Sequence, residues 1–471
     1  MQPQYSASLK TWAKMRDTLA GEERMQNQSV SQNSTYKNCS TSEPSTSMTQ
    51  YLRMSEGLRN QSKNGWGRFC DYVFRTMYYP FPLTIKNQSL GMINGQDAII
   101  ELPTQLEYLL TDATQTQEPL KNVLSCINDE QLSVGRIGIM LETTVDKSKP
   151  FNIMFYNAES VVDWEYNTVH GEQHATWVKL KEIVSVRNGG SFENEDQYRI
   201  LAIDEAGYYF QYVTTDENVA PDNVFNVPED NRLYPTIREQ KTKSIPFVMC
   251  NVNSLGFNIE APPLEGVSDA SIKLFQGDAE YRDVLYWAGV ATLFTVGMHS
   301  DEADKVTIGN GQYNNISDSG GSAMYVSAGA DAVAPNKDNV ESLKMYCASL
   351  GVDLLNQGIE SGDALNARIN VKTSTLKTLS KTGSYALEAL LRMGAEWMGL
   401  NPDDISVKGN VEFGDKVYNA DELLKLSGLV MNGNMSEQAL FNVMKSQGLT
   451  SAETIEDEDL VKDIALNTGT L

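Results

Sequence analysis

The stretch Pro262–Gly289, PPLEGVSDASIKLFQGDAEYRDVLYWAG, indicates the fold class of this chain. Apolar and small residues recur three or four positions apart along it, as on one face of an α-helix. A proline also suits the first turn of a helix, where its missing N–H is not needed. We therefore expect a long helix from residue 261 to about 296, interrupted by one polar residue, Asp278. The members of the stripe are Leu264, Val267, Ser271, Leu274, Tyr281, Leu285 and Ala288.

Two more helices are predicted downstream by the same spacing. The first covers residues 338–357, and the second begins near Ser374, which can cap it. A loop, Ile359–Thr373, separates them. The second stripe spans nearly four heptads, which predicts a helix that packs lengthwise against another helix. The stripe residues are Val340, Leu343, Cys347, Leu350 and Leu354, then Leu376, Leu379, Gly383, Ala386, Leu390, Met393, Trp397 and Leu400.

The segment between the first two helices, residues 298–335, is rich in Gly, Ser and Asn. It contains two short strand candidates, Val306–Ile308 and Ala323–Val326. Such a composition predicts a small β or α/β insertion between two helices.

Residues 66–260 predict a mixed α/β region. Helices are expected at 66–79 and, in two pieces, at 104–130, with Gly135 before the first strand and residues 215–240 as a loop. Glu205-Ala206-Gly207 predicts a hairpin turn. The expected strands are 136–142, 151–156, 176–186, 198–203 and 208–214, followed by a buried run at 245–248. The expected helical core residues are Leu106, Leu109, Leu110, Leu120, Val123, Leu124 and Ile127.

Both ends of the chain differ from this central part. Residues 1–25 carry an amphipathic pattern, and residues 26–50 are rich in Ser, Thr, Asn and Gln, as in a flexible arm. This arm, next to the amphipathic segment, would either dock on a neighbouring subunit or form a mobile tail. The last part predicts short helices at 420–431 and 436–447 and an acidic run at 453–463. The amphipathic residues are Tyr5, Leu9, Trp12, Met15 and Leu19.

The charge of the chain restricts its functional class. The 471 residues carry a formal charge of −24. A generic nucleic-acid binder is basic, so the charge balance taken alone argues against tight DNA binding. A channel through which DNA slides is compatible with an acidic wall, and simple solubility explains the same charge. Five scattered cysteines indicate no zinc site or disulfide framework. No secretory signal or membrane span is expected.

A search for catalytic motifs leaves no candidate. The sequence has no GxxxxGK[ST], GxGxxG or GxSxG element that would hold a nucleotide or a nucleophile. His170, Glu172 and His174 form HGEQH, but a zinc helix needs the Glu directly after the first His. We expect this segment to be a polar turn between strands. The sequence therefore predicts no enzyme, cofactor or metal.

One segment reverses the acidic character of the chain. Between Ala364 and Leu387 there are four cations, Arg368, Lys372, Lys377 and Lys381, and no Asp or Glu. Either these cations contact phosphates, or they pair with acidic neighbours in an assembly. Lys377 needs a partner of some kind, because the N-terminus of a helix disfavours positive charge.

The order of these parts resembles the portal proteins of tailed bacteriophages. The helix 262–289, the Gly-rich insertion, the returning helix, the loop and the helix ending in EWMGL resemble the stem, clip, second stem helix, tunnel loop and long helix of that family. The segment Trp12–Asp17 (WAKMRD), followed by Gly21, resembles an opening W-x-x-x-R-D segment of one portal group. Tyr156–Trp164 (YNAESVVDW) resembles its Y-x-A-E-x-I-x-x-W segment.

The resemblance implies an α+β, portal-like fold, with a mixed α/β wing, a helical stem, a small α/β clip and a long helix leading to a short helical crown. The family's long C-terminal barrel is missing here. The implied parts are an N-terminal arm and linker at 1–65, wing at 66–260, stem helix at 261–297, clip at 298–337, second stem helix at 338–357, tunnel loop at 358–373, long helix at 374–400 and crown at 401–471.

The resemblance also implies a location and partners. The family forms a ring, usually of twelve copies, at one capsid vertex of the virion, the head-tail junction, after synthesis in the bacterial cytoplasm. Implied partners are the terminase, a tail adaptor, the major capsid and scaffolding proteins, and double-stranded DNA in the channel, with no membrane. The implied DNA-facing residues are Arg368, Asn370, Lys372, Lys377 and Lys381. The implied clip residues that bind partners are Val306, Ile308, Tyr313 and Tyr325.

Three alternatives remain open at the level of the sequence. An adaptor or minor head protein would lack the helix–clip–helix–loop–helix order. A carbohydrate-active tail protein would carry long β repeats and aromatic-rich turns, which are absent from this sequence. A hydrolase would use a pair among the 62 carboxylates, and nothing singles out a pair.

Overall fold

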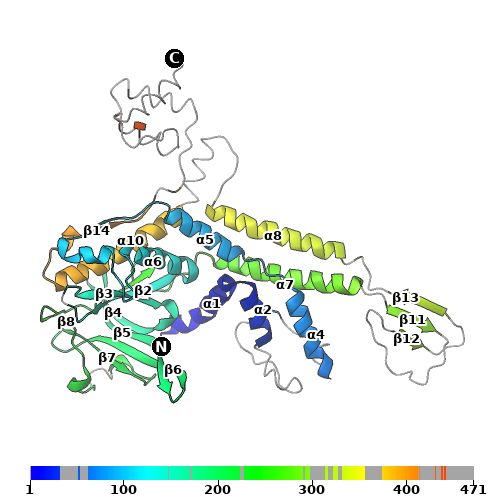
Figure 1. Ribbon diagram of the computed structural model, residues 1–471, viewed down its shortest axis with the longest axis horizontal. Coiled ribbons are helices and arrows are strands. Elements are labelled where there is room, and N and C mark those ends of the chain that lie inside the picture. The colour runs from blue at the N-terminus through cyan, green and yellow to red at the C-terminus, as the bar shows by residue number, and fades with distance from the viewer. Residues whose placement is uncertain are drawn as a thin grey trace.

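The fold is mixed α and β, as the sequence predicts. In this computed structural model, two long helices, α7 and α8, leave a body of helices and sheets side by side and end at a small sheet (Figure 1). The structure describes residues 2–31, 51–52, 62–146, 148–169, 172–222, 227–289, 292–296, 313–316, 322–326, 331, 333–355, 374–411, 413, 430, 436, 438, 440 and 441.

The helices of the described residues lie in the body and in the two-helix extension. They are α1 (Pro3–Ala20), α2 (Glu22–Ser31), α4 (Ser62–Arg75), α5 (Phe81–Ile93), α6 (Leu120–Val134), α7 (Glu265–Ala288), α8 (Val333–Leu355) and α10 (Ser374–Trp397). Short 3-10 turns are η1 (Thr104–Leu110), η2 (Ala158–Ser160), η4 (Glu229–Asn231) and η6 (Pro402–Asp404).

The strands of the described residues form five small sheets, with the orders β10-β2-β3, β4-β5-β6-β7, β1-β14, β8-β9 and β12-β11-β13. All pairs are antiparallel except β11 with β12. The strands are β1 (Ile99–Glu101), β2 (Arg136–Thr143), β3 (Phe151–Asn157), β4 (Val161–Val169), β5 (Glu172–Asn188), β6 (Ser191–Ile203), β7 (Tyr209–Thr214), β8 (Thr236–Ile237), β9 (Gln240–Lys241), β10 (Phe247–Asn251), β11 (Thr292–Val296), β12 (Tyr313–Ile316), β13 (Ser322–Val326) and β14 (Ser406–Lys408).

The sheet β10-β2-β3 lies at the centre of the body. Its middle strand is buried for six consecutive residues, which matches a strand covered on both faces. Gly135 ends α6 in a left-handed conformation, with a φ of 86°, and the chain turns directly into β2. The buried Ile139 pairs with Phe155 on one side and Val248 on the other.

Helix α10 packs inside this body, which corrects one prediction. Its stripe was expected to lie lengthwise against a single helix. Instead, α10 crosses α6 and rests on β10, β2 and β14. Small residues allow the close approach: a Cβ on Gly394 would lie 2.7 Å from Phe151 Cζ and 2.9 Å from Leu141 Cδ1. The 3,4 spacing was right about which face is buried, but spacing alone does not identify what covers that face.

Helix α1 is part of the core. Trp12 and Met15 are buried in the main hydrophobic cluster. Arg16 binds both carboxylate oxygens of Glu130 at 2.7 Å and also reaches Glu159 at 2.9 and 3.0 Å. Thr18 Oγ1 lies 3.1 Å from Ser268 Oγ on α7. The arm at 26–50, for which the sequence left docking or mobility open, lies mostly outside the described residues.

The first long helix is shorter than predicted. The helix α7 ends at Ala288, and residues 292–296, which were expected to be helical, form β11. The run Thr292–Val296, TLFTV, is rich in β-branched and aromatic residues, which favour a strand. The two prolines lie just before the helix, where Pro262 accepts the N–H of Glu265 through its carbonyl at 3.1 Å.

Most predicted strands are confirmed, but others were missed. The strands β1, β4, β8, β9, β12 and β14 were not predicted, and the strands β5 and β6 are longer than expected. The expected core residue Leu110 is exposed. The predicted polar turn around HGEQH is partly wrong, because His174 pairs with Asn167 inside the β4–β5 hairpin. The predicted loop at 359–373 and the strand Val306–Ile308 lie outside the described residues, and so do most residues of the predicted tail helices.

Candidate DNA-facing and partner-binding surfaces

The first half of α10 presents an exposed cationic face. Lys381 and Tyr385 are exposed and lie four residues apart, and Lys377 is half-buried one turn earlier. Among the described residues, neither Lys377 nor Lys381 forms an ion pair. In the second half of the helix, by contrast, Arg392 pairs with Glu388 at 2.8 Å. The unpaired cations are therefore confined to the end of α10 that follows the predicted tunnel loop.

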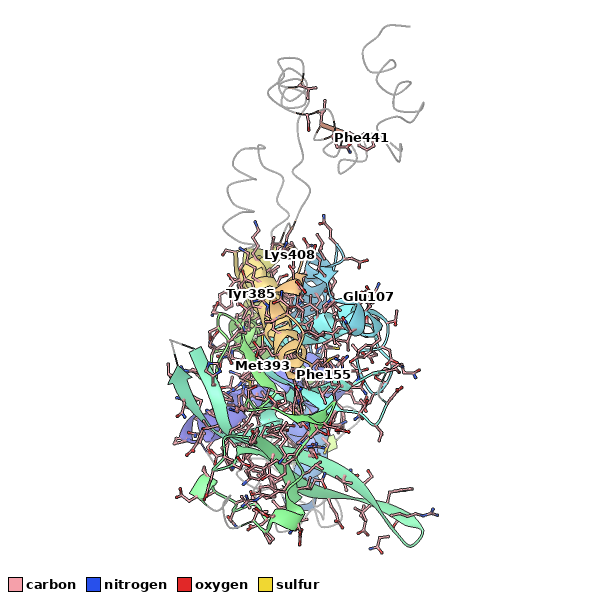
Figure 2. All side chains as sticks on the ribbon, turned by 90° about the vertical axis from the view of Figure 1, so that its left-hand side faces the viewer. Glu107, Phe155, Tyr385, Met393, Lys408 and Phe441 are labelled. Carbon is pink, nitrogen blue, oxygen red and sulfur yellow. The ribbon has the colours of Figure 1, made fainter. Side chains whose placement is uncertain are left out.

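Strand β14 adds a further cation to this region. The N–H of Gly409 donates to Ser384 Oγ at 2.9 Å, and the N–H of Val407 donates to Glu388 Oε2 at 2.9 Å. These bonds hold the strand along α10, with Val407 buried and Lys408 exposed. Figure 2 shows Lys408 and Tyr385 in the upper part of the body. We call Lys377, Lys381, Tyr385 and Lys408 the cationic strip.

The structure tests only part of the predicted DNA-facing set. Arg368, Asn370 and Lys372 lie outside the described residues. Their role stays a prediction. Tyr385 and Lys408 were not identified from the sequence. Tyr385 lies between the positions of the apolar stripe, and this spacing predicts that its side chain is exposed. No local sequence pattern connects Lys408 with α10.

A buried carboxylate fixes the base of the two-helix extension. Asp278, the polar break of the first stripe, accepts the backbone N–H of Met77 at 2.8 Å and the guanidinium of Arg282 at 2.6 Å. Arg75 pairs with Asp283 at 3.1 Å and lies 4.0 Å from the centre of the Tyr286 ring. These contacts attach α4 and the segment after it to α7.

The far part of this extension leaves apolar side chains uncovered. The buried residues of α7 end at Ala279, although the helix continues to Ala288. We call the exposed apolar residues on α4, α7 and α8, and on the segment after α4, the stem surface. They are Phe74, Met77, Leu285, Tyr286, Met345 and Tyr346. Helices with apolar residues on two sides need more cover than one partner helix supplies.

The sheet at the end of the extension contains two of the predicted partner-binding residues. Leu293 on the central strand β11 pairs with Tyr313 on β12 and with Tyr325 on β13, and Tyr325 is exposed. Val306 and Ile308 lie outside the described residues. The partner-binding role of all four residues stays a prediction.

Comparisons with known proteins concern the same part of the chain. Residues 263–398 match the model of a domain of unknown function (DUF4055). This match runs from the start of α7 through the sheet β12-β11-β13 and α8 to the end of α10. The extension and the long helix therefore form one unit of related sequence. No curated protein matches the chain.

Solved structures of phage-like particles are similar at low identity. The chain is 11% identical to a chain from the neck of an empty gene transfer agent (GTA) particle computed with C6 symmetry, with a TM-score of 0.37, covering 84% of this chain and 94% of that chain. It is 10% identical to chains from the virion of a native GTA particle and from the native neck computed with C12 symmetry, with TM-scores of 0.35 and 0.36. Each of these covers 79% of this chain and 89% of the other.

Two features are absent from the described part of the chain. Within the described part of the chain, no helix is long and apolar enough to span a membrane. The same residues contain no cluster of three or more His, Cys, Asp or Glu side chains that could hold a metal ion.

Proposed function

We propose that this protein is the portal of a tailed phage or phage-like particle, a ring-forming subunit at the head-tail junction through which DNA enters and leaves the capsid. The observation that carries the proposal is the helical extension. Helix α7 leaves the α/β body, a three-stranded sheet follows, α8 returns to the body, and α10 crosses it. This is the order on which the resemblance to portal proteins rests.

The stem surface supports assembly into a ring. The apolar side chains of α7 and α8 that remain exposed in one copy can be covered by equivalent helices of neighbouring copies. Identical copies that meet through two different surfaces form a closed ring when the rotation between them permits. A lone copy would keep Leu285, Tyr286, Met345 and Tyr346 in water, which costs free energy in proportion to the apolar area.

The cationic strip supports contact with DNA within an otherwise acidic wall. Lys377, Lys381 and Lys408 can each approach a phosphate, and the Tyr385 hydroxyl can donate a hydrogen bond to one. A few contacts of this kind weaken as salt rises, which permits movement of the duplex. We assign Arg368, Asn370 and Lys372 to the same role through their position in the predicted tunnel loop.

The proposal includes the partners that the resemblance implies and no catalytic role. The terminase and a tail adaptor would bind the sheet β12-β11-β13, and the capsid and scaffolding proteins would bind the α/β body. The sequence contains no motif for nucleotide binding or nucleophilic catalysis, so the motor activity would belong to the terminase.

Electron microscopy and sedimentation over a range of salt concentrations test the proposal. We expect ring-shaped particles, and we expect Tyr346→Glu to reduce their number because it places a charge on the stem surface. Asn87→Glu, which adds the same charge at an exposed position on α5, serves as the matched control. A monodisperse monomer at every salt concentration would contradict the proposal.

A further inference from the structure

The hairpin between β5 and β6 extends beyond the sheet to which it belongs. The strand β4 pairs with β5 only as far as Leu180, and β7 pairs with β6 only from Tyr198. Residues 181–197 therefore form a two-stranded ribbon without a third strand, and Figure 2 shows it reaching away from the body at the lower right. An isolated two-stranded hairpin has marginal stability in water. We call these residues the ribbon.

One face of the ribbon is acidic. Glu193 pairs across the ribbon with Val186, and Glu195 pairs with Val184. Side chains two residues apart on a strand point to the same face, so both carboxylates lie on one face together with the two valines. Glu195 has no ion pair among the described residues, and Glu193 accepts only a 3.3 Å hydrogen bond from Asn188.

The opposite face of the ribbon carries two exposed large apolar side chains among polar ones. Ile183 and Phe192 are 68% and 70% exposed. The guanidinium of Arg187 lies 6.0 Å from the centre of the Phe192 ring, and Lys181 pairs with Asp196 at 2.6 Å. Exposed large side chains on an unsupported ribbon indicate a contact surface. The free carboxylates on the other face indicate that the contacting surface is cationic.

A cationic surface lies at the other end of the same sheet. Lys241 lies 3.8 Å from the centre of the Tyr234 ring and 5.7 Å from that of Tyr208, and Lys243 lies 5.9 Å from the Tyr208 ring. Arg238 is exposed in the turn before β9. None of these three cations has an ion pair among the described residues. We call Arg238, Lys241, Lys243, Tyr208 and Tyr234 the lysine–tyrosine patch.

The framework of the sheet holds this patch in place. The N–H of Tyr209 donates to the carbonyl of Thr242 at 2.9 Å, which fixes the segment 241–243 beside β7. The Tyr234 hydroxyl donates to Asp204 at 3.1 Å. The patch is therefore attached to the β6–β7 turn, and the ribbon tip lies at the opposite end of β6.

The ribbon and the patch of one copy cannot meet. The strand β6 runs from Ser191 to Ile203, and a strand rises about 3.3 Å per residue, so the two surfaces are on the order of 40 Å apart. They can meet only between two copies. A contact between two different surfaces of identical chains is heterologous and closes into a ring when the rotation permits.

The charges also match in number. Glu193 and Glu195 are two residues apart on an extended strand, which separates them by roughly 6.6 Å. Lys241 lies at the end of β9, and Lys243 follows in the bend after it. Two carboxylates can face two ammonium groups at the same time, while the nearby tyrosine rings offer apolar area to Val184 and Val186 on the same face of the ribbon.

We propose that the ribbon of one copy docks on the lysine–tyrosine patch of the adjacent copy, so that Glu193 and Glu195 face Lys241 and Lys243. This inference rests on the proposed function, because it requires an assembly of identical copies. It adds a second contact between copies, in the α/β body, to the contact along the stem surface.

Charge exchange tests the contact in the full-length chain. Either Glu193→Lys with Glu195→Lys, or Lys241→Glu with Lys243→Glu, places like charges opposite each other. We expect each pair to lower the association constant between copies by at least about tenfold. The chain carrying all four changes should recover it. Glu101→Lys with Glu107→Lys, which are exposed elsewhere on the body, provide the control for net charge.

Cross-linking separates this inference from the proposed function. A chain with Glu195→Cys and Lys241→Cys should form a ladder of disulfide-linked copies on oxidation, whereas each single variant should not. Rings that form without the ladder, and that tolerate both charge reversals, would overturn the contact and leave the portal proposal standing. A chain that never assembles, in the native or any variant form, would overturn both.

Discussion

The buried carboxylate of Asp278 on α7 accepts the backbone N–H of Met77 at 2.8 Å. This bond satisfies a main-chain donor where the chain leaves α4, and the same carboxylate also receives Arg282. A charged residue in the middle of an apolar stripe thus stabilises the attachment of one helix to another.

Asp278→Ala should lower the free energy of unfolding by about 2–4 kcal/mol, because it leaves the N–H of Met77 buried without an acceptor. Asp278→Asn, which keeps one acceptor oxygen, should cost less. Asp283→Asn breaks the more exposed pair with Arg75 and should cost under about 1 kcal/mol. Chemical denaturation gives all three values, and equal effects for the buried and the exposed site would contradict the assignment.

Arg136 should lower the stability of the core. It is buried at the start of β2, neither Nη atom has a hydrogen-bond partner among the described residues, and its guanidinium lies 5.0 Å from the centre of the Trp164 ring. Burial lowers the pKa of Arg136 to about 10, which shows that the charge is poorly compensated. Arg136→Met should leave the free energy of unfolding unchanged or raise it by about 1–2 kcal/mol.

The matched control is Arg199→Met. Arg199 pairs with Glu142 at 2.9 Å and with Glu182 at 2.7 Å, and although burial alone would lower its pKa, Tyr156 and these carboxylates raise it. Its removal leaves two carboxylates unpaired and should cost about 2–4 kcal/mol. Denaturation curves that placed Arg136→Met below Arg199→Met in stability would mean that the charge of Arg136 is well compensated in the core.

Gly394→Ala should lower the free energy of unfolding by about 1–3 kcal/mol, because the new methyl group would collide with Phe151 and Leu141. Gly91→Ala is the control, since it lies in α5 with open space around its Cβ. There the gain in helix propensity should stabilise the chain by about 0.5–1 kcal/mol. Thermal or chemical denaturation of both variants would show opposite signs, and the same sign for both would count against close packing of α10.

Cys347 reports whether α7 and α8 stay together. Its side chain is buried against Ala270 and Leu274, and burial raises the pKa of the thiol to about 11. At pH 8 the thiolate population should be about 100-fold below that of an ordinary cysteine. Alkylation followed by mass spectrometry should therefore be slow in the folded chain and fast in denaturant. Equally fast reaction in both conditions would mean that the two helices separate readily.

The cationic strip should affect DNA and leave assembly unchanged. Lys377→Gln with Lys381→Gln should yield normal rings that package or retain less DNA, and the difference from the native chain should shrink as salt rises, because fewer phosphate contacts give a weaker salt dependence. The predicted loop residues should behave alike when Arg368→Ala is combined with Lys372→Ala. Lys273→Gln, on the exposed side of α7, removes a cation away from the strip and should package normally. Normal packaging by the variant with Lys377→Gln and Lys381→Gln would mean that the cationic strip does not contact DNA.

The sequence predicted the positions of the helices better than it predicted which elements pack against them. The stripes of α7, α8 and α10 predicted much of the buried faces because a spacing of three and four is a local property, but Leu285 at the far end of the α7 stripe is exposed. The neighbours of those faces are not local: Gly394 meets Phe151 on a strand more than two hundred residues earlier. The end of α7 was misplaced because Thr292–Val296 is apolar enough for either a helix or a strand, and pairing with β13 decides between them.

The candidate sites also combine residues that a local sequence pattern identifies with residues that only the fold brings together. Lys377 and Lys381 were recognised because a run without acidic residues is visible in an acidic chain. Lys408 belongs with them only through bonds such as that of Gly409 with Ser384. The ribbon was underestimated for a related reason: Glu193 and Glu195 lower the apparent strand propensity of a segment that its partner strand holds extended.

The contacts of α1 also determine when this helix can be covered. Arg16 binds Glu130, and Thr18 meets Ser268, which are 114 and 250 residues further along the chain. During synthesis, α1 is therefore made well before the surfaces on which it packs, and its native contacts are complete only after α7 has been translated. Until then, part of the surface that covers α1 is missing. A nascent chain halted before residue 268 should leave α1 more accessible to chaperones and proteases than the full-length chain does.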